Sequence, residues 1–190
     1  GALSGVGLVV LLQLNRVAGA IALASLAPVA AYPFMKRITW WPQAWLGLVF
    51  SWGALVGWAA VKGEIGPAAR LLYVGSILWV IGYDTIYALQ DKEDDALVGV
   101  KSSALALGPR ARAGVALFYL VALLLWGAAI WEVRGEPLAL AALIPMAIHL
   151  LWQAATLKAD DGGDALAKFR SNRFAGLLMF LACLVVGTSV

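Results

Sequence analysis

Residues 113–131 read AGVALFYLVALLLWGAAIW, an unbroken run without Asp, Glu, Lys or Arg. A helix needs about 20 mostly apolar residues to cross the hydrocarbon core of a bilayer. The run therefore predicts a transmembrane helix.

Similar apolar runs fill most of the remaining sequence. One of them, 71–90, contains a single charged residue, Asp84, and the others contain none: 1–15, 17–35, 38–61, 137–157 and 174–190. Strand-type alternation of apolar and polar residues is absent. The pattern predicts an all-α, multi-pass transmembrane bundle of seven helices, the first of them incomplete, within one domain that spans 1–190.

Composition narrows the class of protein further. Hydrophobic residues make up 63% of the chain and charged residues 13%, against about 25% charged residues in ordinary soluble domains. This composition excludes a soluble enzyme and a disordered chain, and the single cysteine excludes an internal disulfide. The net charge of +3 is too small for a nucleic-acid partner, so membrane lipid is the expected surrounding.

Basic residues are distributed unequally between the two ends of the predicted bundle. Side one comprises the segments 36–42, 91–112 and 158–173. Of the fourteen Lys and Arg residues, side two carries four, namely Arg16, Lys62, Arg70 and Arg134, and side one carries the rest. Because basic residues mark the cytoplasmic side of membrane proteins, side one is expected to face the cytoplasm.

Asp84 is the one charged residue inside an apolar run, and a carboxylate at membrane depth is costly enough to suggest a function. At about 100° per residue, Asp91 and Asp95 fall within about 20° of Asp84 around a helix that continues to Asp95, and Tyr87 lies about 60° to one side. A stripe of carboxylates at a water interface fits a metal site. A solvated acidic loop balanced by Lys92 and Lys101 remains the other interpretation.

Basic residues on side one extend the metal interpretation. Lys36 and Arg37 end the second apolar run, and Lys101 follows the acidic segment. Mg²⁺ takes oxygen ligands and commonly bridges one or two carboxylates to substrate phosphates. The side-one end of the bundle where these residues gather is called the mouth below. Carboxylates and basic groups together are expected in a site that binds a metal and a diphosphate.

Several strings resemble the UbiA superfamily of intramembrane prenyltransferases. The spacing Asp84-x-x-Tyr87-x-x-x-Asp91-x-x-x-Asp95 resembles the family's second aspartate-rich motif. The stretch 32–37 (YPFMKR), the stretch 99–102 (GVKS) and the stretch 171–176 (SNRFAG) resemble its 4-hydroxybenzoate branch. The resemblance runs over nearly all of the sequence.

The resemblance implies a bundle of about nine helices and an enzyme of ubiquinone biosynthesis in the bacterial inner membrane. Such an enzyme transfers a polyprenyl group from polyprenyl diphosphate to the ring of 4-hydroxybenzoate, beside the phenol oxygen, and depends on Mg²⁺. The family's first motif, Asn-Asp-x-x-Asp-x-x-x-Asp, is absent from the sequence. The expectation is a C-terminal fragment that lacks two N-terminal helices.

Each matching residue then takes an expected role. Asp91 and Asp95 are expected to bind Mg²⁺, and Asp84 to position the aromatic acid or a metal-bound water. Tyr87 is expected to shield the allylic cation or to bond a carboxylate. Candidates for the diphosphate or the benzoate carboxylate are Lys36, Arg37 and Lys101. Asn172 is expected either to cap the last span or to contact substrate.

Other functions remain open on sequence alone. Within the family, the acceptor could be haem, homogentisate or a naphthoate. A transporter of cations or protons could use Asp84, but it would be expected to carry charges at midplane in several spans. A lipid-head-group phosphotransferase would be expected to show a denser motif with Asp-Gly and Ala-Arg signatures, which the sequence lacks.

Overall fold

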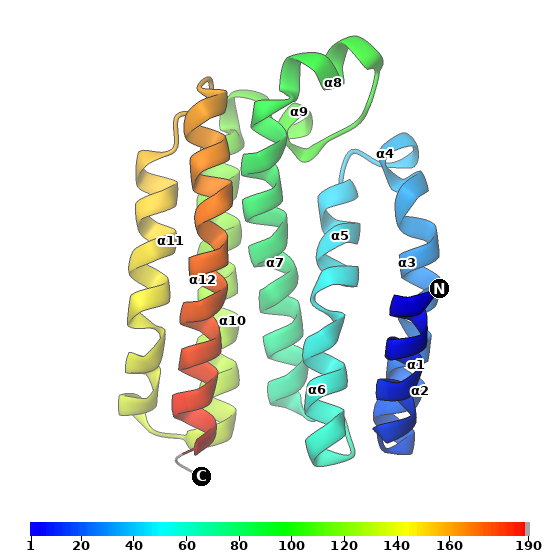
Figure 1. The fold of residues 1–190 in the computed structure, drawn as a ribbon. Coiled ribbons are helices and arrows are strands. Elements are labelled where there is room, and N and C mark those ends of the chain that lie inside the picture. Colours follow the sequence, from blue (N-terminus) through cyan, green and yellow to red (C-terminus); the bar gives the residue numbers. More distant parts are fainter. Residues whose placement is uncertain (189–190) are drawn as a thin grey trace.

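The computed structural model describes residues 1–188, and they fold into a bundle of helices (Figure 1). Six helical segments are long and apolar enough to cross a membrane: Arg16–Ile38, Pro42–Lys62, Pro67–Gln90, Ser103–Arg134, Pro137–Thr156 and Gly162–Gly187. A seventh apolar helix, α1 (Ala2–Gln13), is shorter. The predicted all-helical, multi-pass class is confirmed, although 189–190 at the end of the predicted last run lie outside the described residues.

Several of these segments contain breaks between shorter helices. The first consists of α2 (Arg16–Ala24), α3 (Leu26–Ala31), η1 (Tyr32–Phe34) and α4 (Met35–Ile38), and the second of α5 (Pro42–Phe50) and α6 (Trp52–Lys62). The third is the single helix α7 (Pro67–Gln90). The later ones comprise α9 (Ser103–Leu107), η2 (Gly108–Arg110) and α10 (Ala111–Arg134), then η3 (Pro137–Leu143) and α11 (Ile144–Thr156), and finally α12 (Gly162–Thr188).

Helix α7 is the centre of the packing, with α10 and α12 on one side and α5 on the other (Figure 1). Two glycines seven residues apart, Gly75 and Gly82, let α7 approach α10 closely. A Cβ at position 75 would lie 2.8 Å from the indole of Trp126, and one at position 82 would overlap the ring of Tyr119. Small residues at contacts between membrane helices allow this kind of close packing.

A buried polar network joins α10, α11 and α12. The side chain of Gln153 is fully buried; it accepts a hydrogen bond from the Tyr119 hydroxyl at 2.6 Å and donates one to Ser171 at 3.0 Å. Its amide nitrogen also lies 3.0 Å from Nε2 of His149. Inside a bilayer such groups need partners within the protein, and this network supplies them.

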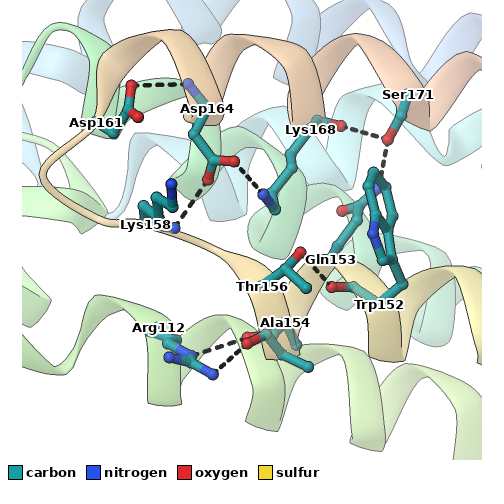
Figure 2. Close-up of polar contacts among 11 residues, drawn as sticks. Arg112, Trp152, Gln153, Ala154, Thr156, Lys158, Asp161, Asp164, Lys168 and Ser171 are labelled. Atoms are coloured by element: carbon teal, nitrogen blue, oxygen red, sulfur yellow. Dashed lines mark hydrogen bonds and ion pairs between the residues drawn. The ribbon is translucent and has the colours of Figure 1, made fainter.

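The connection between α11 and α12 is ordered by polar contacts (Figure 2). Arg112 donates to the backbone carbonyls of Ala154 and Ala155 at the end of α11. Asp164 forms an ion pair with Lys168 one turn along α12. The last helix therefore begins at Gly162, twelve residues before the apolar run from 174 that the sequence predicted.

Short helices gather at one end of the bundle. Helix α4, helix α8 (Lys92–Val98) and helix α9 lie at the end where α7 reaches Gln90 (Figure 1). The α11–α12 connection lies at the same end, whereas 63–66 and 135–136 lie at the other. The segments assigned to side one thus share one end of the bundle, as predicted.

Candidate active site at the side-one end

The acidic segment does not form one continuous helix. Helix α7 ends at Gln90, and Asp91 has φ −101° and ψ 10° before α8 begins at Lys92. Figure 1 shows α8 turned away from the axis of α7. The expected straight stripe of Asp84, Asp91 and Asp95 is therefore wrong, because the chain bends at Asp91.

The two ends of the acidic segment are influenced by the positive charge of the same residue, Lys36. The ammonium group of Lys36, on α4, interacts electrostatically with Asp84 inside α7 and with Asp95 in α8. Tyr32 and Tyr83 also lie within electrostatic range of Asp84. The charge of one lysine on α4 therefore acts on a carboxylate of α7 and on a carboxylate of α8. The shared mouth for a metal and a diphosphate stays a prediction.

Asp91 and Asp95 provide the carboxylates at the surface of this mouth. Both are partly exposed, and the Asp95 backbone N–H donates to the Asp91 carbonyl at 2.8 Å. Burial raises the pKa of the Asp95 carboxyl above its usual range, as do Asp91 and Asp94, whereas Lys36 and a hydrogen bond from Ser102 lower it. A nearby cation stabilises the ionised form of such a carboxyl.

The donor set fits a divalent metal that is held partly by its substrate. Among the described residues, no three His, Cys, Asp or Glu side chains converge as a metal-binding group. Mg²⁺ usually takes one or two protein carboxylates together with phosphate oxygens and water, so Asp91 and Asp95 are sufficient as the contribution of this segment.

The three basic candidates are placed differently from one another. Lys36 and Arg37 are exposed on α4. The Lys101 ammonium instead donates to the Ile38 carbonyl at 3.3 Å and lies 5.7 Å from the centroid of the Trp40 ring. Lys101 is thus engaged with the α4 end of the first membrane segment.

Tyr87 and Asn172 both point toward the contact between α7 and α12. The Tyr87 ring lies 4.6 Å from that of Phe169, with 36% of the residue exposed. Asn172 is buried inside α12, accepts a hydrogen bond from Trp79 at 3.0 Å and donates to the Lys168 carbonyl at 3.0 Å. It does not cap the last span, because α12 begins ten residues earlier, and its amide serves helix packing.

The sequence did not predict a group of three buried, hydrogen-bonded polar residues beneath the mouth, Gln43, Thr85 and Ser103, which is called the buried knot below. The Gln43 side chain accepts from the Ser103 backbone N–H at 3.0 Å, and the hydroxyls of Ser103 and Thr85 lie 2.6 Å apart. All three residues are buried, and they join α5, α9 and α7 next to Asp84. The only sequence signal was Gln43 itself, a polar residue at the start of an apolar run.

A comparison against known protein families identifies the family of this chain. The model of the UbiA prenyltransferase family matches residues 1–184. The chain belongs to the UbiA prenyltransferase family. The resemblance to this family seen in the acidic and basic strings is therefore confirmed.

Curated relatives of this UbiA-family chain are similar over most of its length. It is 46% identical over 186 residues to the 4-hydroxybenzoate polyprenyltransferase, mitochondrial, of Rattus norvegicus, covering 95% of this chain and 49% of the relative. The proteins of the same name from Drosophila melanogaster and Arabidopsis thaliana are 43% and 44% identical, over 96% and 92% of this chain and 46% and 43% of the relatives. This UbiA-family chain spans about half the length of the curated relatives it matches. No solved structure matches it.

Proposed function

We propose that the protein transfers a polyprenyl group from polyprenyl diphosphate to the ring of 4-hydroxybenzoate, at the carbon beside the phenol oxygen, in ubiquinone biosynthesis. The observation that carries the proposal is the match of residues 1–184 to the UbiA prenyltransferase family, and the charge of Lys36, which acts on both Asp84 and Asp95 at one end of the bundle, supports it. The names of the curated relatives support the same acceptor.

The proposed site holds a divalent metal, Mg²⁺, at Asp91 and Asp95. When bound, the metal supplies positive charge that neutralises the leaving diphosphate. Lys36 and Arg37 bind diphosphate oxygens from α4, because both ammonium and guanidinium groups donate hydrogen bonds to phosphate. Their charge is most effective in a site that excludes water.

The reaction replaces one bond at the allylic carbon and one bond at the ring carbon by a single new carbon–carbon bond. The bond between the allylic carbon and the diphosphate oxygen breaks, and the diphosphate leaves with the bonding electrons. The ring carbon beside the phenol oxygen attacks the allylic cation and forms the new carbon–carbon bond. The proton on that ring carbon then passes to the departed diphosphate, and the electrons of the C–H bond restore aromaticity. Asp84 accepts a hydrogen bond from the acceptor's phenol, and the exposed ring of Tyr87 shields the cation with its π face.

The direct test supplies the membrane-embedded protein with a polyprenyl diphosphate, Mg²⁺ and a panel of acceptors. Prenylated 4-hydroxybenzoate is the expected product. A higher rate with haem, homogentisate or a naphthoate would show that the proposed acceptor is wrong. Uptake of cations without any prenyl transfer would show that the protein is a transporter.

Replacing Asp84 by Asn should separate the acceptor from the metal. Asp84 lies about 10 Å along α7 from Asp91, since each residue of a helix rises 1.5 Å. We therefore expect Asp84→Asn to raise the KM for 4-hydroxybenzoate or to lower kcat about tenfold or more. The Mg²⁺ concentration that gives the half-maximal rate should stay nearly unchanged, and a large shift in that concentration would assign Asp84 to the metal.

The proposed location is an inner membrane, with side one facing the cytoplasm of a bacterium or the matrix of a mitochondrion. The excess of basic residues on side one supports this orientation. In a Cys183→Ser background, Gly163→Cys should react with an impermeant thiol reagent only from that side, and Glu64→Cys only from the opposite side. Both positions are exposed. The reverse labelling pattern would invert the proposed topology.

A further inference from the structure

We propose that Lys101 is a positioning residue, which holds the end of the short helix α4 and with it the residue Lys36, and that Lys101 does not bind the diphosphate itself. The inference rests on the proposed function, because it assigns a role within that site. It replaces the expectation that Lys101 contacts substrate.

The last carbonyl groups of α4 accept hydrogen bonds from Lys101. A helix leaves its last carbonyls without partners, and basic side chains often satisfy them. In α4 the Thr39 backbone N–H reaches the Met35 carbonyl at 2.9 Å. The next two bonds both come from Lys101: its backbone N–H donates to the Lys36 carbonyl at 3.3 Å, and its ammonium donates to the Ile38 carbonyl at 3.3 Å.

The segment that carries Lys101 is fixed on both sides. Before it, Gly99 adopts a left-handed conformation with φ 73° that ends α8 and reverses the chain. After it, Ser103 is tied to Gln43 of α5 and Thr85 of α7 by the buried knot. Lys101 is therefore a fixed point relative to α7, and a residue bound to it is also fixed relative to α7.

Lys36 is the residue for which this placement matters. Its own side chain is exposed, so packing does not determine its direction. Its backbone carbonyl is held by Lys101, and its charge is the one that acts on both Asp84 and Asp95. Loss of Lys101 should thus free the end of α4 and weaken whatever Lys36 does between the two carboxylates.

The first experiment tests the hold on α4 without any assay of transfer. Hydrogen–deuterium exchange of the purified protein would be followed for residues 35–41 in the wild type, Lys101→Met and Lys101→Arg. We expect exchange about fivefold faster in Lys101→Met, because the substitution removes the ammonium bond to the Ile38 carbonyl, whereas the backbone bond from position 101 to the Lys36 carbonyl remains. Lys101→Arg keeps a donor and should exchange at close to the wild-type rate. Lys62→Met, at the opposite end of the bundle, is the matched control and should leave 35–41 unchanged.

The second experiment is a double-mutant cycle of prenyl transfer with Lys36→Met. Two residues that act as a unit give non-additive effects, whereas independent ligands give multiplied effects. We expect Lys101→Met to lower kcat/KM about tenfold or more in the wild-type background and less than about threefold in the Lys36→Met background. Equal losses in both backgrounds would make Lys101 an independent ligand and overturn the inference.

The two experiments separate failure of the inference from failure of the proposed function. Unchanged exchange of 35–41 in Lys101→Met would overturn the positioning role, whatever the activity. Faster exchange in a protein whose wild type transfers no prenyl group would leave Lys101 as the residue that holds α4, and would refute the proposed function alone.

Discussion

Asp95→Asn and Asp91→Asn should each reduce prenyl transfer at least about a hundredfold, the largest loss of activity expected from single substitutions. A neutral amide cannot replace the charge of a carboxylate that binds a divalent metal, and each tenfold loss of rate corresponds to about 1.4 kcal/mol of transition-state stabilisation. Asp91 lies at the bend between α7 and α8 and Asp95 lies in α8, and both are outside the packed core. Transfer of a radiolabelled prenyl group in isolated membranes measures the effect.

The neighbouring residue Asp94 provides the control for these substitutions. It is exposed in α8 and is the same residue type in the same segment, so Asp94→Asn removes an equal charge from the surface. It should keep most of the wild-type rate. The assignment of Asp91 and Asp95 to the metal fails if raising the Mg²⁺ concentration restores near-normal rates in both variants, or if Asp94→Asn is equally damaging.

The sequence predicted the membrane segments well because the apolar runs are long and the charged residues between them are few. It did not predict the start of α12. There the helix begins twelve residues before the apolar run, and the ion pair of Asp164 and Lys168, one turn apart, stabilises this polar extension. The extension moves Asn172 from the start of a helix to its interior, which is why its predicted capping role failed.

The spacing of the acidic residues predicted the wrong geometry for the candidate site, and the roles of those residues stay predictions. Helical spacing places Asp84 and Asp95 on one face only if the helix is continuous, and spacing contains no information about a bend at Asp91. The electrostatic influence of Lys36 on both carboxylates depends on the fold of α4 and α8. The knot of Gln43, Ser103 and Thr85 depends on pairs far apart in the chain, which no local pattern reveals.

Gly82→Leu should cause the largest loss of stability expected from a single substitution in the core. A Cβ at position 82 already overlaps the Tyr119 ring. That ring cannot move away cheaply, because its hydroxyl donates to the buried Gln153 at 2.6 Å. Overpacking a core costs about 1–3 kcal/mol and sometimes more, and a broken buried hydrogen bond adds about 1 kcal/mol. The free energy of unfolding in mixed micelles should therefore fall by about 3 kcal/mol or more.

Gly57→Leu makes the same substitution where space is open. No atom lies within 4 Å of a Cβ built at position 57 of α6. Both variants exchange glycine for a better helix former, so the change in helix propensity, about 1 kcal/mol, is common to them. Gly57→Leu should unfold at or slightly above the wild-type free energy, and the difference between the two variants reports the contact of α7 with α10. If Gly82→Leu were as stable as Gly57→Leu, the close approach of these two helices at Tyr119 would not exist in the folded protein.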